Sequence, residues 1–307
     1  MKFISAQPAI DYYAWQVEIY IHNFLSFNIL PNDIQIIASY EDSVCESWLK
    51  LQKSFPEVNF FFYKDTRKEK GYIPSIQPHI LKKHYATHRE LEKETVFYHD
   101  CDFIFTKEFD FTPFLNDDNW YFSDTVAYIG AEYIKSKGED VFEKMCFLAG
   151  IDPKIVEKNQ INSGGAQKLI KNVTHQYWNQ VEIDANNLYF GLGELKNKRK
   201  DGDPYGVQIW CASMWAELWN AWKMNRNILV IKEFDFAWAT CPISKLDTVS
   251  FFHNAGVPGR DQGMFYKGAY REDLPYFKNI NVENSRCSKY YYDWVQKVET
   301  QTCLKKH

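Results

Sequence analysis

The sequence lacks several short patterns that define common protein classes. It contains no G-x-G-x-x-G and no G-x-x-x-x-G-K-[ST], so a classical dinucleotide-binding domain or a P-loop is a poor interpretation. Its seven cysteines are scattered and include no C-x-x-C pair, which argues against both a zinc site and a disulfide framework. We therefore expect free thiols in a reducing compartment.

Membrane and nucleic-acid signals are also weak. No stretch of 18 apolar residues is present, and the first residues, MKFISAQPAIDYY, lack the apolar centre of a signal peptide. We expect no membrane span and a cytoplasmic protein. The formal net charge of −4 excludes the global basic field of a strong nucleic-acid binder, but it does not exclude a local basic patch.

Aromatic residues, by contrast, are abundant, with 10 Trp, 20 Tyr and 23 Phe in 307 residues. A chain of this length can build a sizeable core, and so many rings exceed what that core requires. They indicate an additional aromatic-lined groove of the kind used to stack sugars or bases, although a core rich in Phe and Tyr explains them equally well.

The first hundred residues alternate between strand-like and helical patterns. Strands are predicted at 2–6, 33–40, 58–63 and in the run that ends at Asp100, and helices at 12–27, 43–54 and 74–88. This order predicts an α/β fold: a Rossmann-like, mostly parallel central sheet flanked by helices.

The second half is less regular. We predict helices at 140–150, at 207–222 and from Ser163 to about Ile170, a strand at 228–231, a charged loop at 196–204 and a helical tail. We expect one domain, 1–307, with a nucleotide-binding half at about 1–110, a donor-sugar and acceptor half at about 111–285, and a C-terminal tail at 286–307.

The strongest chemical signal is the segment Thr95–Phe105, TVFYHDCDFIF. An apolar run that reads as a buried strand leads directly to Asp100 and Asp102, and ligands bind at the carboxyl ends of such strands. Two buried carboxylates this close require compensation, which a divalent cation such as Mn²⁺ or Mg²⁺ supplies. We expect a metal-bound diphosphate here, although many D-x-D triplets are ordinary turns.

Two further segments carry polar groups suited to an oxygen-rich ligand. In Asn162–Gln167, NSGGAQ, the glycines permit close approach of a ligand and the polar residues can cap a helix or bind sugar hydroxyls. In Phe251–Val257, FFHNAGV, an apolar pair precedes His253, whose imidazole suits Mn²⁺ beside two carboxylates. Lys267 downstream can neutralise a diphosphate.

In this order, the three segments resemble the GT-A class of nucleotide-sugar-dependent glycosyltransferases over roughly residues 1–270. Asp100-x-Asp102 resembles the metal-binding D-x-D motif, and Asn162–Gly165 is similar to the N-[AS]-G segment that contacts the donor sugar. His253–Gly256 with Lys267 resembles the H-x-x-G…K element of glycogenin-like and lipopolysaccharide galactosyltransferase-like enzymes. The segment 72–78, YIPSIQP, is similar to hydroxyproline arabinosyltransferase-like proteins.

This resemblance implies a Mn²⁺ or Mg²⁺ site at Asp100, Asp102 and His253, and a UDP-sugar as donor. It implies donor contacts from Asp100 and from strand-end, loop and turn residues: Ala6, Gln7, Tyr40, Asn162, Ser163, Gly164, Gly165, Gln167, Gly256 and Lys267. The chain departs from the family pattern where Val257-Pro258-Gly259-Arg260 extends the loop before Lys267. It also carries Ser213 where an acid is first sought on the helix 208–222.

An inverting transferase needs a general base near the acceptor hydroxyl. Asp124 and Glu217 are our candidates, although each is equally explained as a capping or surface acid. A retaining enzyme can dispense with this base, and the His253 element resembles enzymes of that kind.

The acceptor is predicted from the general style of the chain, which resembles proteins of phage-like genomes. A 5-hydroxymethyl-pyrimidine in DNA is the single acceptor we expect, reached by base flipping in the host cytoplasm. Basic clusters at 67–70, 82–84 and 196–200 could contact phosphates. A polysaccharide or protein hydroxyl, a non-catalytic nucleotide-sugar-binding protein and a metal-dependent nucleotidyltransferase remain open.

Overall fold

The computed structural model describes residues 1–198, 206–260 and 263–304. Its contacts divide the chain into two compact units built from interleaved segments. The first unit comprises Met1–Lys64, His99–Pro113 and Lys232–His307, and the second comprises Asp65–Tyr98 and Phe114–Ile231.

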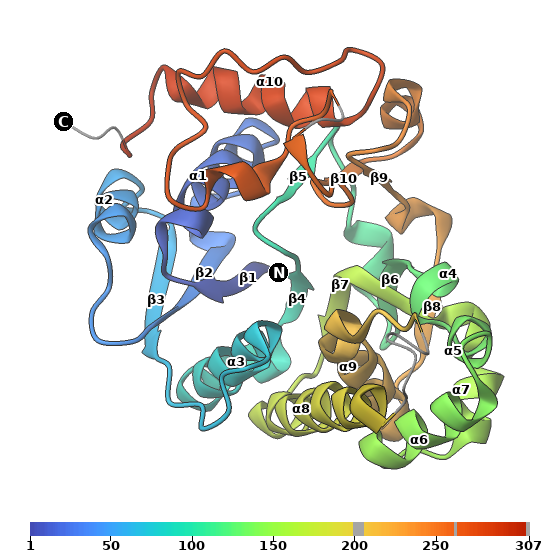
Figure 1. The fold of residues 1–307 in the computed structure, drawn as a ribbon. Coiled ribbons are helices and arrows are strands. Elements are labelled where there is room, and N and C mark those ends of the chain that lie inside the picture. Colours follow the sequence, from blue (N-terminus) through green and yellow to red (C-terminus); the bar gives the residue numbers. More distant parts are fainter. Residues whose placement is uncertain (199–205, 261–262, 305–307) are drawn as a thin grey trace. The chain divides into compact units, whose positions relative to one another are not determined.

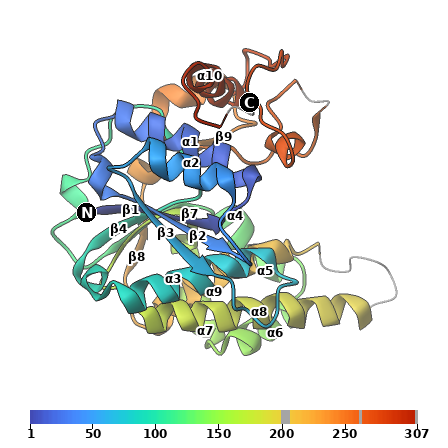
Figure 2. The ribbon, with the colours of Figure 1, turned by 90° about the vertical axis from the view of Figure 1, so that its left-hand side faces the viewer.

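The first unit begins with three parallel strands, β1 (Lys2–Pro8), β2 (Ile34–Tyr40) and β3 (Asn59–Lys64), in the spatial order β3-β2-β1. Helices α1 (Asp11–Ser26) and α2 (Glu46–Ser54) connect them and cover one face of these strands (Figure 2). Apolar side chains of the strands are buried beneath these helices, since crossover helices pack on the faces of parallel strands.

A second, three-stranded sheet completes the first unit. Strand β10 (Phe251–His253) lies between β5 (Phe103–Phe105), to which it is antiparallel, and β9 (Phe236–Trp238), to which it is parallel. Asn23 of α1 fixes β5, because its amide donates to the Phe105 carbonyl at 3.0 Å and accepts from the Phe105 N–H at 2.8 Å. Helix α10 (Ser288–Glu299) packs against α1.

The second unit contains four strands in the order β4-β7-β6-β8. Strand β7 (Gly164–Lys171) is antiparallel to β4 (Thr95–Tyr98) and β6 (Trp120–Asp124), and β6 is parallel to β8 (Ile228–Val230). Its helices are α3 (Ile76–Thr87), α4 (Val126–Ile129), α5 (Ala131–Lys135), α6 (Glu139–Ala149), α7 (Pro153–Lys158), α8 (His175–Lys198) and α9 (Ala212–Lys223). Helix α8 packs between α3 and α9 (Figure 1).

The expected α/β class, with a mostly parallel central sheet flanked by helices, is confirmed. The predicted strands and helices of the first hundred residues are all present within a few residues of their expected bounds, as are α6, α9, β8 and α10. The 24-residue helix α8 was not predicted, and it occupies 196–198, where a loop was expected. The rest of that loop, 199–204, lies outside the described residues.

The predicted helix from Ser163 to Ile170 is wrong, because this segment forms β7. Gly164 lies so close to β6 that a Cβ atom there would stand 2.4 Å from the Cβ of Phe122, and one at Gly165 would stand 2.5 Å from the Cε of Met214. The register between β6 and β7 shifts between Phe122 and Ser123, beside these glycines. The glycine pair therefore serves close packing in a bulged sheet, not a helix N-terminus.

Candidate functional site

Asp100 and Asp102 lie on the turn immediately before β5. This turn is closed by the Phe103 N–H, which donates to the Asp100 carbonyl at 3.2 Å, and the His99 N–H donates to Ile4 of β1 at 3.0 Å. The two carboxylates differ in accessibility: the Asp100 side chain is 38% exposed, whereas that of Asp102 is 4% exposed. One acid is thus open to a ligand, and the other is held inside the first unit.

The pairing of β10 with β5 brings His253 to these acids, since it sets His253 opposite Phe103. The Nε2 atom of His253 lies 3.2 Å from Oδ1 of Asp102 and 3.6 Å from Oδ2 of Asp100. The Trp238 ring stacks on the imidazole, with centroids 5.4 Å apart and planes at 22°, and so fixes its orientation. The loop after β10 is held as well, because the Asn254 N–H donates to the Asp102 carbonyl at 3.0 Å.

These three side chains fit a divalent cation. One ligand atom from each of Asp100, Asp102 and His253 lies within 4.8 Å of the others, and among the described residues this is the one such group of three. Two carboxylates with one imidazole match the oxygen and nitrogen donors that Mn²⁺ accepts, and they leave further positions for a substrate. The sequence-based grouping of these residues agrees with this geometry.

Lys267 belongs to the same cluster, where its ammonium group forms an ion pair with Oδ2 of Asp102. Burial would raise the pKa of the Asp102 carboxyl, but Lys267 and His253 outweigh burial and hold that pKa well below its usual range. Conversely, burial lowers the pKa of the Lys267 ammonium and Asp102 more than offsets this, so the pKa of Lys267 is raised. Lys267 therefore acts as a built-in counter-ion of the buried carboxylate.

Tyr12 and Tyr13, at the start of α1, are site neighbours that the sequence analysis did not single out. Burial raises the pKa of the Tyr12 hydroxyl, and the positive charge of Lys267 offsets part of this rise. The Arg271 guanidinium lies over the Tyr12 ring, 5.7 Å from its centroid. The available signal was a pair of tyrosines that begins four residues after the end of β1, near the carboxyl edge where ligands bind.

Three residues near strand ends are expected to meet a nucleotide base: Ala6, Gln7 and Tyr40. β1 extends to Pro8, so Ala6 and Gln7 are its third-last and second-last residues, and both are 2% exposed. The Gln7 amide donates to the Ile37 carbonyl at 3.2 Å, inside the sheet. Tyr40 does end β2 and is partly exposed. Gly256, also expected near the donor, follows β10 with a φ of 86°.

The NSGGAQ segment belongs to the second unit and is largely engaged in holding β7. Oδ1 of Asn162 accepts from the Val230 N–H at 3.3 Å, and Oε1 of Gln167 accepts from the Ser123 hydroxyl at 2.9 Å. The Ser163 hydroxyl is buried and has no hydrogen-bond partner among the described residues. These contacts give Asn162 and the Gln167 carbonyl oxygen structural roles, whereas the Ser163 hydroxyl and the Gln167 amide nitrogen have no partner among the described residues.

The two candidate bases also belong to the second unit, and their contacts favour structural roles. Asp124 ends β6, is exposed, and accepts from the Val126 N–H at 2.9 Å, as a helix cap does. Glu217 is 3% exposed and forms a buried ion pair with Lys168, and its backbone carbonyl accepts from the Tyr177 hydroxyl at 2.9 Å. A carboxylate committed to a buried lysine is poorly placed to take a proton from an acceptor.

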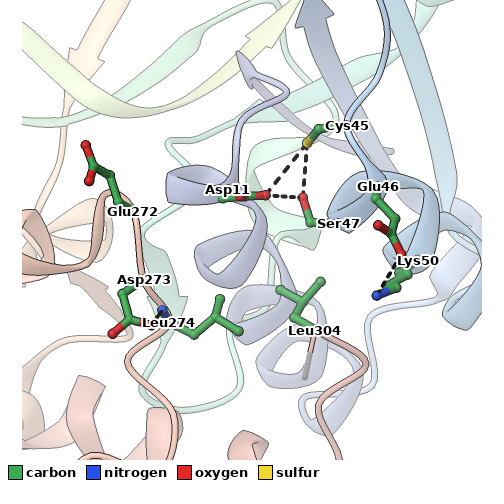
Figure 3. Close-up of a pocket in the computed structure, with 9 residues that line it drawn as sticks. All are labelled: Asp11, Cys45, Glu46, Ser47, Lys50, Glu272, Asp273, Leu274 and Leu304. Atoms are coloured by element: carbon green, nitrogen blue, oxygen red, sulfur yellow. Dashed lines mark hydrogen bonds and ion pairs between the residues drawn. The ribbon is translucent and has the colours of Figure 1, made fainter. Parts of the chain in front are cut away.

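A cavity of about 190 Å³ lies in the first unit where α1 and α2 begin. Figure 3 shows the Ser47 hydroxyl donating to Asp11 at 2.6 Å, with the Cys45 sulfur 3.0 Å from the same hydroxyl. The remaining walls include Glu272, Asp273 and two leucines. Some of its polar groups bond one another, Ser47 with Asp11 and Lys50 with Glu46, and we assign the cavity no part in the site.

Comparisons with known proteins give similarity in structure alone: no family model and no curated protein matches the chain. Solved structures that match include the apo-form glycosyltransferase GlyE of Streptococcus pneumoniae TIGR4, at 12% identity and a TM-score of 0.45, over 96% of this chain and 60% of that one. The chain thus spans about 60% of the GlyE structure's length.

Two other matches cover a smaller part of this chain. A glycosyltransferase involved in glycosylation of the major capsid of PBCV-1 is 12% identical, with a TM-score of 0.38, over 83% of this chain and 94% of that one. Mouse xyloside xylosyltransferase 1 is 9% identical, with a TM-score of 0.41, over 82% and 96%. Because these TM-scores lie below 0.5, we infer no function from these similarities.

Among the described residues, no helix has the length and apolar character needed to cross a membrane.

Proposed function

We propose that this protein is a metal-dependent glycosyltransferase, which moves a sugar from a nucleotide sugar to an acceptor hydroxyl. The observation that carries the proposal is the cluster in which Asp100, Asp102 and His253 converge within 4.8 Å, with Lys267 in contact. Asp100, Asp102 and His253 would hold Mn²⁺, or else Mg²⁺, and a metal bound there supplies Lewis-acid stabilisation of a departing diphosphate.

The chain's own groups then have separate tasks. Asp100 is 38% exposed and can meet both ligand and solvent, whereas buried Asp102 positions His253 and Lys267. The Lys267 ammonium offers a point charge to the diphosphate as negative charge builds on it. A UDP-sugar is the donor we propose, because the D-x-D and H-x-x-G…K elements resemble those of enzymes that use such donors.

The sequence predicts a hydroxymethyl-pyrimidine in DNA as the acceptor, but the basic clusters give this prediction little support. Arg67 pairs with Asp65 at 3.0 Å and Lys82 pairs with Glu182 at 2.5 Å, so their charges are already balanced within the second unit. Residues 199–200 of the third cluster lie outside the described residues. Glycosyl transfer is proposed independently of this acceptor. Cytoplasmic location is a separate prediction from the sequence.

The test measures release of nucleoside diphosphate from a panel of nucleotide sugars with Mn²⁺, Mg²⁺ or EDTA. We expect Mn²⁺-dependent release that is abolished in Asp102→Asn and greatly reduced in His253→Ala. The matched control is Asp247→Asn, since Asp247 is an exposed acid of the same unit. Calorimetric titration with Mn²⁺ should show weaker binding in both site variants.

Other outcomes select the competing functions. Binding of a nucleotide sugar without any turnover would favour a non-catalytic binding protein. Tighter binding of a nucleoside triphosphate, with release of pyrophosphate, would favour a nucleotidyltransferase. Full activity in Asp102→Asn would remove the metal site from the mechanism altogether.

A further inference from the structure

The first unit contains an open groove of about 450 Å³ in the chain between β10 and α10. Two tyrosine rings, two amides and two cationic groups line it, from Arg260, Tyr266, Tyr270, Lys278, Asn279 and Asn281. This size lies within the range of small-molecule sites, and the mixture of rings and hydrogen-bonding groups is typical of them. Nothing in the proposed donor chemistry uses this groove.

The wall formed by the tyrosines is firmly anchored. Phe265, directly before Tyr266 in the sequence, is fully buried, and its N–H donates to the Ser288 hydroxyl of α10 at 2.7 Å. The Tyr270 ring stacks on Phe265 with centroids 5.6 Å apart and planes at 8°, and the indole N–H of Trp15 donates to the Tyr270 carbonyl at 3.2 Å. Binding of a ligand to this wall would therefore cost little conformational entropy, because the wall is already ordered.

The same short turn connects the groove to the metal-binding cluster. Residues Lys267–Tyr270 form one turn of 3₁₀ helix, with Tyr266 just before it. Lys267 extends to Asp102, whereas Tyr266 and Tyr270 line the groove. The Tyr266 ring lies against the turn at Gly268, where a Cβ atom would stand 2.5 Å from it. A molecule in the groove is thus held by residues directly next to the group that meets the diphosphate.

The charges argue against a polyanion as the occupant. Lys278 is already paired with Asp273 at 2.8 Å, and Arg260 donates to the Ala269 carbonyl at 3.2 Å. One net positive charge remains from these three side chains, far fewer than nucleic-acid binding normally employs. Amides that both donate and accept, beside tyrosine faces, suit a hydroxylated ring with apolar C–H faces.

We infer that this groove is the acceptor site and that its occupant is a carbohydrate. The inference rests on the proposed glycosyl transfer and names its acceptor class. In the reaction, a hydroxyl oxygen of the bound sugar forms a bond to the anomeric carbon of the donor. The bond from that carbon to the diphosphate oxygen breaks, the diphosphate keeps the electron pair, and the hydroxyl proton leaves with it.

The test compares the wild type with Asn279→Ala/Asn281→Ala and with Tyr266→Ala. The matched control is Asn284→Ala, an exposed asparagine of the same segment outside the groove. Binding of glucose, galactose, N-acetylglucosamine, xylose, lactose and cellobiose to the donor-free protein is followed by saturation-transfer NMR. Transfer to the same sugars, and to duplex DNA carrying hydroxymethylcytosine, is followed with the active donor.

We expect at least one of these sugars to bind and to accept transfer. The two lost amides should raise its Michaelis constant about tenfold, while Asn284→Ala matches the wild type. Loss of sugar binding in Tyr266→Ala, with an unchanged unfolding temperature, would be equally supportive. The inference is overturned if no sugar binds, if binding ignores the groove variants, or if modified DNA is the molecule whose transfer depends on Asn279 and Asn281.

Failure of the proposed function has a different signature. In that case the wild type would release no diphosphate from any nucleotide sugar, whatever the NMR experiment shows for the groove. Sugar binding that depends on Tyr266 would then identify a carbohydrate-binding site without transferase activity, and the assignment of the groove as an acceptor site would be overturned.

Discussion

Lys267 and Asp102, 165 residues apart in the chain, form an ion pair within the first unit. The pair places a cation beside the carboxylate that also lies 3.2 Å from His253. A metal bound by Asp100, Asp102 and His253 must therefore share Asp102 with an existing positive charge. With a neutral imidazole, the two carboxylates and the ammonium group carry a net charge of −1 without a metal and +1 with a divalent metal, which suits the binding of an anionic diphosphate.

This arrangement predicts opposite effects of one substitution on two ligands. Lys267→Met should strengthen binding of Mn²⁺ alone, because a competing cation is removed from Asp102. It should weaken binding of a nucleoside diphosphate in the presence of Mn²⁺ by about tenfold or more, because a charge-assisted contact is lost. Calorimetry measures both affinities, and Lys267→Arg, which keeps the charge, is the control. Equally weakened binding of Mn²⁺ and of the nucleoside diphosphate would contradict the role of Lys267 as a counter-ion.

A pH-dependent prediction concerns His84, on α3 of the second unit. Burial, with a smaller contribution from His88, lowers the pKa of the His84 imidazole to about 3. In the unfolded chain this imidazole has a pKa of about 6.5, so between the two values the unfolded state binds more protons. The stability that neutral His84 contributes is therefore present above about pH 6.5 and is lost as the pH falls toward 3.

Urea unfolding between pH 7 and pH 4 measures this effect. The free energy of unfolding should fall by up to about 1.4 kcal/mol per pH unit from this one group. His84→Gln should flatten the pH dependence of the free energy of unfolding in that window relative to the wild type. An identical slope in His84→Gln would show that His84 does not titrate as a buried neutral group.

Glu217 provides a test of structure against catalysis. Glu217→Gln leaves the Lys168 ammonium buried without its counter-charge, so we expect a loss of about 3–5 kcal/mol in unfolding free energy. The double variant Lys168→Met/Glu217→Leu removes both charges and should recover much of this loss. A general base would behave differently: Glu217→Gln would keep its stability and lose transfer rate. Urea unfolding and transfer assays on the same samples separate the two roles.

Local patterns of apolar residues identified most of the secondary structure, because the pattern in each segment reflects which of its residues are buried. The run before Asp100 is apolar on both faces, as a central strand must be, and β4 is buried from Val96 to Tyr98. Asp100, Asp102 and His253 were grouped through their resemblance to a known motif order, and the antiparallel pairing of β10 with β5 is what brings them together.

Contacts with a partner strand or with side chains distant in the sequence could not be predicted from local sequence patterns. From sequence alone, Gly164 and Gly165 resemble the N-terminus of a helix, because their close packing against Phe122 and Met214 is visible only in the structure. Lys267 was assigned to a diphosphate alone, since nothing near it in the sequence indicates that Asp102 is its partner. Glu217 looked available because its burial and its pairing with Lys168 are both long-range properties.

Asn254, next to His253, carries a cost in stability that a substitution should reveal. Its side chain is 2% exposed, and neither amide atom has a hydrogen-bond partner among the described residues. A buried polar group without a partner costs about 1–3 kcal/mol, so Asn254→Leu, of similar volume, should raise the free energy of unfolding by about that amount. Urea unfolding measures the change, and Asn281→Leu at an exposed asparagine is the control. A lower stability in Asn254→Leu would mean that the amide bonds an internal water, and the expected gain would be wrong.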